Sequence, residues 1–226
     1  MSAPFQYDIV EMTATELEDE RRVFGGLTQS IRELNEACLM TTVDAAEAEA
    51  ITTEIAALTA RLNATRDDGA SFGVAITQDG QVRGHGNAVV GLRNAHAVPL
   101  EIHRTGEGRA WSHFELNGLF EGPPTLVHGG VTALILDQIF GEAAADGGHP
   151  GMTGTLTLTY RRGTPLGKLS AEAWIDKVEG IKTHVLGEMR DAEGNVTVEG
   201  HGVFILPRWA REEQARQAGA QPPRYE

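Results

Sequence analysis

The chain has 226 residues, of which 41% are apolar, 6% aromatic and 23% charged. This composition is typical of a globular protein made of one large domain, or of one domain with an added segment. The formal net charge of −13 argues against nucleic acid or an anionic membrane as the main partner, because both bind cationic surfaces. No apolar run approaches the roughly 18 residues that cross a bilayer.

Two further features concern the compartment. The first twenty residues lack a basic segment followed by an apolar one, so they do not resemble a secretory signal. The single cysteine, Cys38, excludes an internal disulfide framework. We therefore expect a cytoplasmic protein.

The segment from residue 13 to residue 66 has a helical pattern. Apolar residues recur there at spacings of three and four, which predicts two helices. The first helix starts with a Thr13–Glu16 capping box and the second starts at Asp44. Their apolar stripes consist of Leu17, Phe24, Leu27, Ile31, Leu34 and Cys38, and of Ala48, Ile51, Ile55, Leu58 and Leu62. We expect these stripes to pack against each other or on the main domain, with Cys38 buried and inert.

Beyond residue 71 the apolar period changes from helical to two. Alternation predicts strands at 109–117, 152–162, 168–178, 181–191 and 195–206, and short turns between the later ones predict antiparallel hairpins. One helix, at about 129–145, interrupts the strands, so the fold class is α+β with a sheet covering that helix. The predicted organisation is a helical extension (1–70), a main domain (71–207) and a frayed polar tail (208–226).

The helix at 129–145 carries an aspartate in apolar surroundings. Gly130, Ala133, Asp137 and Gly141 share one of its faces, so small residues leave space beside the carboxylate. The helix starts at His-Gly-Gly, where free N–H groups and the positive dipole end can hold a carbonyl oxygen as it becomes an oxyanion. This combination favours an acyl-transfer site. An isolated aspartate here could also bond to a strand hydroxyl or face solvent.

Three stretches together resemble a known family. EGPPTLVHGGVTALILDQIFGEA, MTGTLTLTYRRGTPLG and DKVEGIK are similar to the hotdog-fold acyl-CoA thioesterases, and most similar to the PaaI-like branch with His-Gly-Gly before the helix. The resemblance covers roughly residues 100 to 207. It implies an antiparallel sheet wrapped around the central helix, and two subunits that build the sites at their interface as a homodimer, with a tetramer as the alternative.

The resemblance also implies roles for single residues. Asp137 matches the general base or nucleophile, and the Gly129 amide matches the group that polarises the thioester carbonyl. Gly130 continues the turn, and His128 shapes the pocket. Thr153 matches a hydroxyl residue, contributed by the partner subunit, that holds the attacking water or orients the carboxylate. The substrate is then an acyl-CoA, whose CoA moiety is part of the substrate, and no separate cofactor or metal is expected.

The CoA phosphates need basic residues in this acidic chain. Arg162, Lys177 and Lys182 are the candidates that the resemblance places along the rim of the sheet, although charged residues at strand ends are usually only solvated. The segment RNAHAVPLEIH, residues 93–103, matches in outline the family's proline-rich loop near the acyl pocket.

Other readings of the chain are a hotdog enoyl-CoA hydratase and a non-catalytic acyl-CoA-binding or assembly protein. The hydratase pattern needs a histidine five residues after the aspartate, where this chain has Glu142. A G-x-S-x-G match at residues 69–73 lacks the strand before it and the helix after it that a nucleophile elbow needs. With one cysteine and no H-E-x-x-H, no zinc site is expected.

Overall fold

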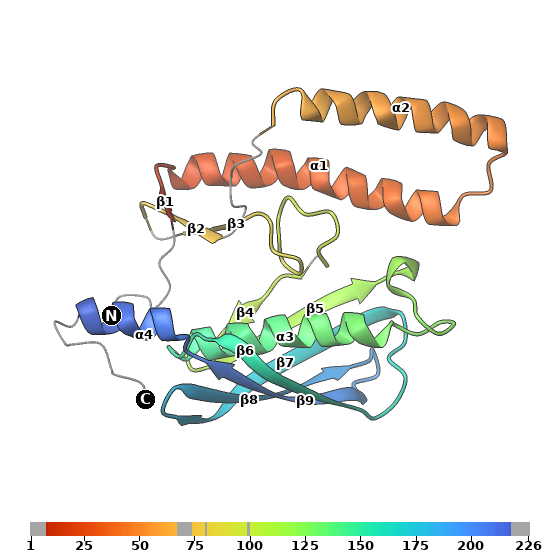
Figure 1. The fold of residues 1–226 in the computed structure, drawn as a ribbon. Coiled ribbons are helices and arrows are strands. Elements are labelled where there is room, and N and C mark those ends of the chain that lie inside the picture. Colours follow the sequence, from red (N-terminus) through yellow and green to blue (C-terminus); the bar gives the residue numbers. More distant parts are fainter. Residues whose placement is uncertain (1–7, 67–73, 80, 99, 218–226) are drawn as a thin grey trace.

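The computed structural model describes residues 8–66, 74–79, 81–98 and 100–217 (Figure 1). The helices are α1 (Ala14–Met40), α2 (Ala45–Asn63), α3 (Gly129–Asp146), α4 (Arg208–Gln217) and the short 3₁₀ helix η1 (Gly118–Phe120). The strands are β1 (Asp8–Val10), β2 (Val74–Thr77), β3 (Val82–Gly84), β4 (His103–Arg104), β5 (Arg109–Leu116), β6 (Met152–Tyr160), β7 (Gly167–Glu179), β8 (Lys182–Arg190) and β9 (Val196–Ile205). The α+β class and the five strands predicted from residue 109 onward are confirmed.

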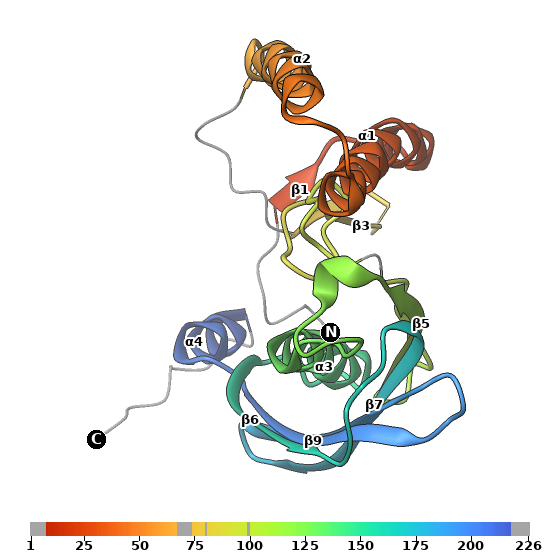
Figure 2. The ribbon, with the colours of Figure 1, turned by 90° about the vertical axis from the view of Figure 1, so that its right-hand side faces the viewer.

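The main sheet has the order β4-β5-β7-β8-β9-β6, is antiparallel throughout and curls around α3 (Figure 2). This is the hotdog arrangement that the resemblance implied. One predicted link is wrong. The strand β6 does not form a hairpin with β7, the next strand in the chain, but pairs with β9 at the other side of the sheet. As a result β6 is an edge strand, and it lies along α3.

The core lies between α3 and the concave face of the sheet. Ile135, Leu136, Ile139 and Phe140 of α3 are completely buried against it. The Phe140 ring sits on glycines: a Cβ at Gly187 would lie 2.4 Å from the ring, and one at Gly200 or Gly202 would lie 2.9 Å from it. The helix can therefore approach the sheet closely only because these strand positions lack side chains.

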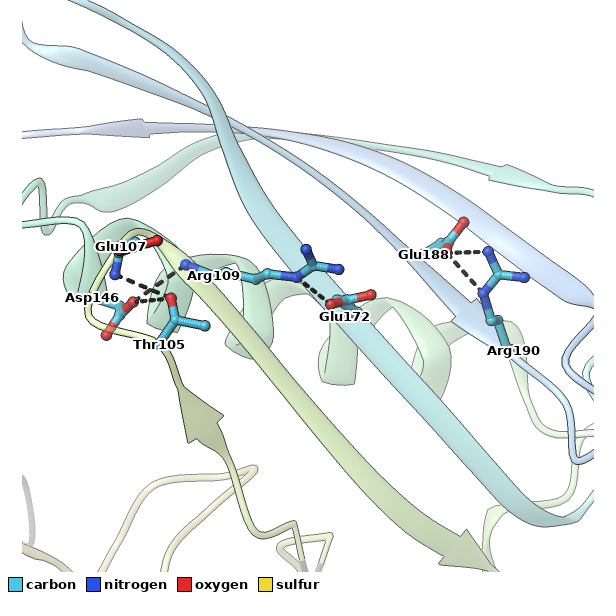
Figure 3. Close-up of polar contacts among 7 residues, drawn as sticks. All are labelled: Thr105, Glu107, Arg109, Asp146, Glu172, Glu188 and Arg190. Atoms are coloured by element: carbon cyan, nitrogen blue, oxygen red, sulfur yellow. Dashed lines mark hydrogen bonds and ion pairs between the residues drawn. The ribbon is translucent and has the colours of Figure 1, made fainter.

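The last residue of α3, Asp146, fixes the turn that leads into β5. Its carboxylate accepts hydrogen bonds from the backbone N–H groups of Gly106 and Gly108, each with a shortest distance of 2.9 Å. It also accepts from the Arg109 N–H at 3.3 Å and from the Thr105 hydroxyl, and Figure 3 shows these two contacts. Figure 3 also shows an ion pair between Arg109 of β5 and Glu172 of β7, and another between Arg190 and Glu188 within β8. Asp146 thus ties the C-terminal end of α3 to the sheet.

The N-terminal helices differ from the prediction. Both predicted caps are present, at Thr13 and Asp44, but the apolar stripes, apart from Leu17, are not buried. Leu27, Ile31 and Leu34 are 39–40% exposed, and α2 has no buried residue. Cys38 is exposed rather than buried. The helix α2 lies on the far side of α1 from the main sheet in both views (Figures 1 and 2), so its apolar stripe does not pack on that sheet.

The first half of α1 is nonetheless attached to the rest of the chain. Leu17 is 1% exposed, Glu20 forms two 2.7 Å hydrogen bonds with Arg83 of β3, and the Arg93 guanidinium lies 3.9 Å from the centre of the Phe24 ring. The strand β1 pairs in parallel with β2, which pairs with β3 in a small second sheet. The α1 segment is therefore held over the main domain.

The predicted frayed tail is partly wrong. Residues 208–217 form the helix α4, in which Ala210 is completely buried. This apolar contact holds the start of the otherwise polar segment against the rest of the chain. The G-x-S-x-G match at residues 69–73 lies outside the described residues, as does the predicted boundary at residue 70. Among the described residues, no helix is both long and apolar enough to cross a bilayer.

Candidate active site

The start of α3 presents one free backbone N–H. His128 is the N-cap, and its Nδ1 accepts a hydrogen bond from the Gly130 N–H at 3.0 Å. Gly129 is the first residue of the helix, so no carbonyl one turn earlier accepts its N–H. No other group in the described part of the chain accepts it. His128 therefore occupies one glycine amide and leaves the other available to a ligand.

The peptide between Gly129 and Gly130 is held at both ends. The Gly129 carbonyl accepts hydrogen bonds from the Tyr160 hydroxyl at 2.8 Å and from the Thr132 hydroxyl at 2.7 Å, while the Gly130 N–H is bound by His128. These contacts fix the direction of the turn. They hold Gly129, whose own N–H is free, and a donor that is held in place can stabilise a developing oxyanion without reorganisation.

The carboxylate of Asp137 is held by a strand hydroxyl. Thr153, near the start of β6, donates a 2.8 Å hydrogen bond to Asp137 Oδ1. Asp137 is half-buried, and the row of small residues predicted on its face consists of the exposed Gly130 and the half-buried Ala133 and Gly141. The aspartate therefore bonds to a strand hydroxyl, one of the alternatives that the sequence allowed. The row of small residues on its helix face lies outside the packed core.

The contact between Thr153 and Asp137 differs from the one that the family resemblance implied. The resemblance implied that Thr153 reaches the aspartate from a partner subunit, but Thr153 of the same chain makes this bond, because β6 lies along α3. The pair that cannot meet within one chain is Asp137 and Gly129. Eight residues of α-helix separate them, or about 12 Å along the axis. Within one chain, therefore, the Asp137 carboxylate and the Gly129 N–H cannot contact the same small reacting group.

The basic candidates do not gather in one chain. Arg162 donates its backbone N–H to Thr197 at one end of β9, whereas Lys182 pairs with Ile205 at the other end. Eight strand residues between those ends correspond to about 27 Å. Lys177 lies near Lys182 and forms an ion pair with Glu179 at 2.8 Å. All three cations are exposed, but a single phosphate group in one chain cannot contact Arg162 together with the two lysines.

A cavity of about 440 Å³ lies between α1 and the first half of α3. Its apolar side is formed by Ala97, Val98, Leu119, Phe120, Val131 and Leu134. It reaches the first turn of α3, because Val131 lies two residues after Gly129 and the Phe120 carbonyl accepts the His128 N–H at 2.9 Å. The predicted loop at 93–103 supplies Ala97 and Val98 to its wall. Its volume is within the range of small-molecule sites, about 300–1,000 Å³.

Two residues of this region were not predicted from the sequence. Tyr160 follows the four alternating threonines of β6, and only its position at the strand end, opposite the start of α3, gives it a partner. Arg32 lies in the N-terminal helix and reaches the cavity only through tertiary packing. By contrast Glu142, which occupies the position of the hydratase histidine, is bound by Arg104 and Gln138.

Comparisons with known proteins identify the family of the chain. The family model of the thioesterase superfamily matches residues 125–198, which contain the start of α3, Asp137, Thr153 and Tyr160. A solved thioesterase superfamily protein shares 32% sequence identity, with 80% of this chain and 94% of that chain covered and a TM-score of 0.72. The chain therefore belongs to the thioesterase superfamily. This membership supports thioester hydrolysis as its class of reaction.

More distant solved structures match about half of the chain. They include thioesterase superfamily member 2 of zebra fish, at 19% identity over 48% of this chain and 81% of that chain, with a TM-score of 0.45. The PaaI protein of the E. coli phenylacetic acid degradation operon matches at 17% identity over 48% of this chain and 79% of that chain, also with a TM-score of 0.45.

Proposed function

We propose that this protein hydrolyses acyl-CoA thioesters to the free acid and CoA, at sites formed between two copies of the chain. The observation that carries the proposal is the pairing of Asp137 with the Thr153 hydroxyl, together with a free Gly129 N–H at the start of the same helix. A carboxylate can act as the general base in thioester hydrolysis, and an N–H donor can stabilise the oxyanion that forms.

The proposed chemistry assigns one task to each group. The Gly129 N–H binds the thioester carbonyl oxygen and stabilises the negative charge that develops on it. Asp137, oriented by Thr153, takes a proton from a water molecule whose oxygen attacks the carbonyl carbon. The tetrahedral intermediate then expels the CoA thiolate, which takes up the proton. In the alternative mode Asp137 attacks the carbonyl itself, and water hydrolyses the resulting anhydride.

A second copy supplies the missing half of each site. The outer edge of β6 has no neighbouring strand among the described residues, and long unpaired edges of this kind are templates for pairing. Antiparallel pairing of β6 with itself, about a two-fold axis near its centre, sets Thr153 opposite Tyr160 of the partner subunit. Because Thr153 binds Asp137 and Tyr160 binds Gly129, this brings Asp137 toward Gly129 of the partner subunit.

The same pairing assigns places to both ends of the substrate. It directs Arg162 toward the start of β6 in the partner subunit, near Lys177 and Lys182 of the partner subunit. The three cations can then bind the CoA phosphates together. The acyl group then enters the cavity between α1 and α3, whose apolar wall begins at the first turn of α3. The substrate carries CoA itself, so the reaction needs only water in addition.

The deciding experiment is a thiol-release assay with short, long and aromatic acyl-CoAs, run on the parent protein, Asp137→Asn and Asp137→Ala. We expect turnover by the parent and a loss of at least about a hundredfold in both variants, the usual contribution of a general base. Equal rates in parent and variants would overturn the proposal. A single turnover in ¹⁸O-labelled water then separates the two attack modes, because only nucleophilic attack transfers the label to the Asp137 carboxylate.

A further inference from the structure

The side of the acyl cavity opposite α3 is formed by polar residues of α1. Gln29, Arg32, Glu33, Asn35 and Glu36 line it. This helix precedes the part of the chain that the family model matches, residues 125–198. Val131 and Leu134 of the apolar wall lie in the matched part, whereas the polar wall comes from the N-terminal segment.

Arg32 has one hydrogen-bond donor that is not satisfied. Its Nη2 donates to the Asn94 carbonyl at 3.1 Å, but its Nε is buried and has no hydrogen-bond partner. Buried donors in native proteins nearly always have an acceptor, so an unpaired one in the wall of a cavity indicates a place for an acceptor on a ligand. The Asn94 carbonyl holds one end of the guanidinium in place.

The charges around the cavity restrict what that acceptor can be. Glu33 and Glu36 of α1 and Glu115 of β5 line the same space as the single Arg32 cation. A carboxylate on the ligand would meet three like charges and one opposite charge. A hydroxyl or keto oxygen accepts from Arg32 without that repulsion, and a hydroxyl can in addition donate to a neighbouring glutamate.

We propose that Arg32 makes this enzyme selective for acyl groups that carry a neutral hydrogen-bond acceptor, a hydroxyl or keto oxygen, along the chain beyond the thioester. This selectivity rests on the proposed function, since it places the acyl group of the thioester in the cavity. It gives the N-terminal helix α1 a direct role in choosing the substrate. Arg32 acts on specificity and takes no part in the bond-breaking step.

The test compares octanoyl-CoA with a series of octanoyl-CoAs that bear one hydroxyl at successive carbons. We expect at least one isomer to have a kcat/KM about five- to tenfold above that of octanoyl-CoA, the gain typical of one hydrogen bond. The advantage should disappear in Arg32→Met and in Arg32→Lys, which keeps a cation near Asn94 but lacks the Nε donor. Arg22→Met is the matched control, because Arg22 is an exposed arginine on the same helix, paired with Asp19.

Urea unfolding of each variant shows whether α1 remains folded. Hydrolysis of every acyl-CoA with no preference for any hydroxyl isomer would overturn the role of Arg32, as would a preference that survives in both Arg32 variants. If no thioester is hydrolysed, the proposed function fails and the role of Arg32 is decided by binding. Non-hydrolysable thioether analogues are then titrated into parent and Arg32→Met, and equal affinities for hydroxylated and plain analogues in the parent contradict the inference.

Discussion

The hydroxyl of Thr153 donates a 2.8 Å hydrogen bond to Asp137, and so connects the edge strand β6 to the middle of α3. This bond leaves Asp137 Oδ2 for water or substrate and fixes the plane of the carboxylate. Thr153→Ser keeps the hydroxyl, whereas Thr153→Val keeps the shape and removes the donor. We expect kcat for acyl-CoA hydrolysis to stay within about twofold in the serine variant and to fall about tenfold in the valine variant, as for a lost hydrogen bond to a charged group. A valine variant as active as the parent would show that the hydroxyl does not contribute to the reaction.

Gly129 can lose its N–H without losing its helix. Proline is favoured at the first helical position, and His128 already has the extended backbone, φ −60° and ψ 130°, that a residue before proline adopts. Gly129→Pro should therefore fold and lose about a hundredfold in kcat, as when one oxyanion donor is removed. Gly129→Ala is the matched control, because it keeps the N–H and its Cβ would meet Tyr160 at an ordinary 3.4 Å. Hydrolysis by the proline variant at the rate of the alanine variant would exclude this amide from the reaction.

The two inactive variants also test whether each site is shared between subunits. A mixture of Asp137→Asn and Gly129→Pro forms heterodimers in which one site carries both defects and the other carries neither. After unfolding and refolding together in equal amounts, we expect recovery of about a quarter of the parent activity, since half of the dimers have one intact site of two. A site built within one chain would give no recovery. The mass in solution, measured by light scattering, gives the oligomeric state of the same samples.

The features that could be predicted from the sequence are those set by residues close to one another along the chain. Period-two alternation located β5 and β7 to β9, and the His-Gly-Gly turn located the start of α3 to the residue, because a helix start and a strand face are set by local pattern. The partner of β6 was not predictable in this way. Adjacent strands with a short link suggest a hairpin, but β6 pairs with β9. That non-local pairing puts Thr153 beside its own Asp137 and Tyr160 beside Gly129.

For the N-terminal helices the secondary structure could be predicted but the burial of their apolar stripes could not. The 3.6-residue period and the caps at Thr13 and Asp44 predicted α1 and α2 correctly, but a stripe of leucines does not specify what covers it. Leu27 and Leu34 are each 40% exposed, and Cys38 is exposed. Burial depends on where the helix is attached, here through Leu17 and the Glu20–Arg83 pair near its first turns. Sequence periodicity contains no information on that attachment.

Asp146 should make a measurable contribution to stability. Partial burial acts to raise the pKa of this carboxyl, but the hydrogen bonds from Gly108, Gly106 and Arg109 outweigh it and the pKa is lowered. Asp146→Asn keeps the size but loses the charge-assisted acceptors, and we expect the free energy of unfolding to fall by about 1–3 kcal/mol. The stabilisation is present above the usual aspartate pKa of about 3.9 and is lost as the pH falls below it. Urea unfolding at neutral pH measures the effect, and no loss of stability in Asp146→Asn would contradict this account of the turn.

His85 gives the fold a second pH dependence, nearer neutrality. Its side chain is buried with Nε2 3.3 Å from Glu20 Oε2, and it is also close to the Arg83 and Arg93 cations. Burial and the Arg83 charge lower the pKa of His85 despite the opposing attraction of Glu20.

A lowered histidine pKa means that the folded protein keeps the ring neutral while the unfolded chain takes up a proton. Stability is therefore complete above the usual histidine pKa of about 6.5 and decreases as the pH falls through it. We expect the free energy of unfolding of the parent to decrease between about pH 8 and pH 5.5 by more than that of His85→Gln, which cannot titrate. The Glu20 carboxyl, whose pKa is lowered by Arg83, stays ionised over this range and does not contribute to the difference. Equal decreases in both proteins would place the pH dependence elsewhere, whereas a smaller one in His85→Gln identifies the attachment of α1 as the acid-sensitive contact.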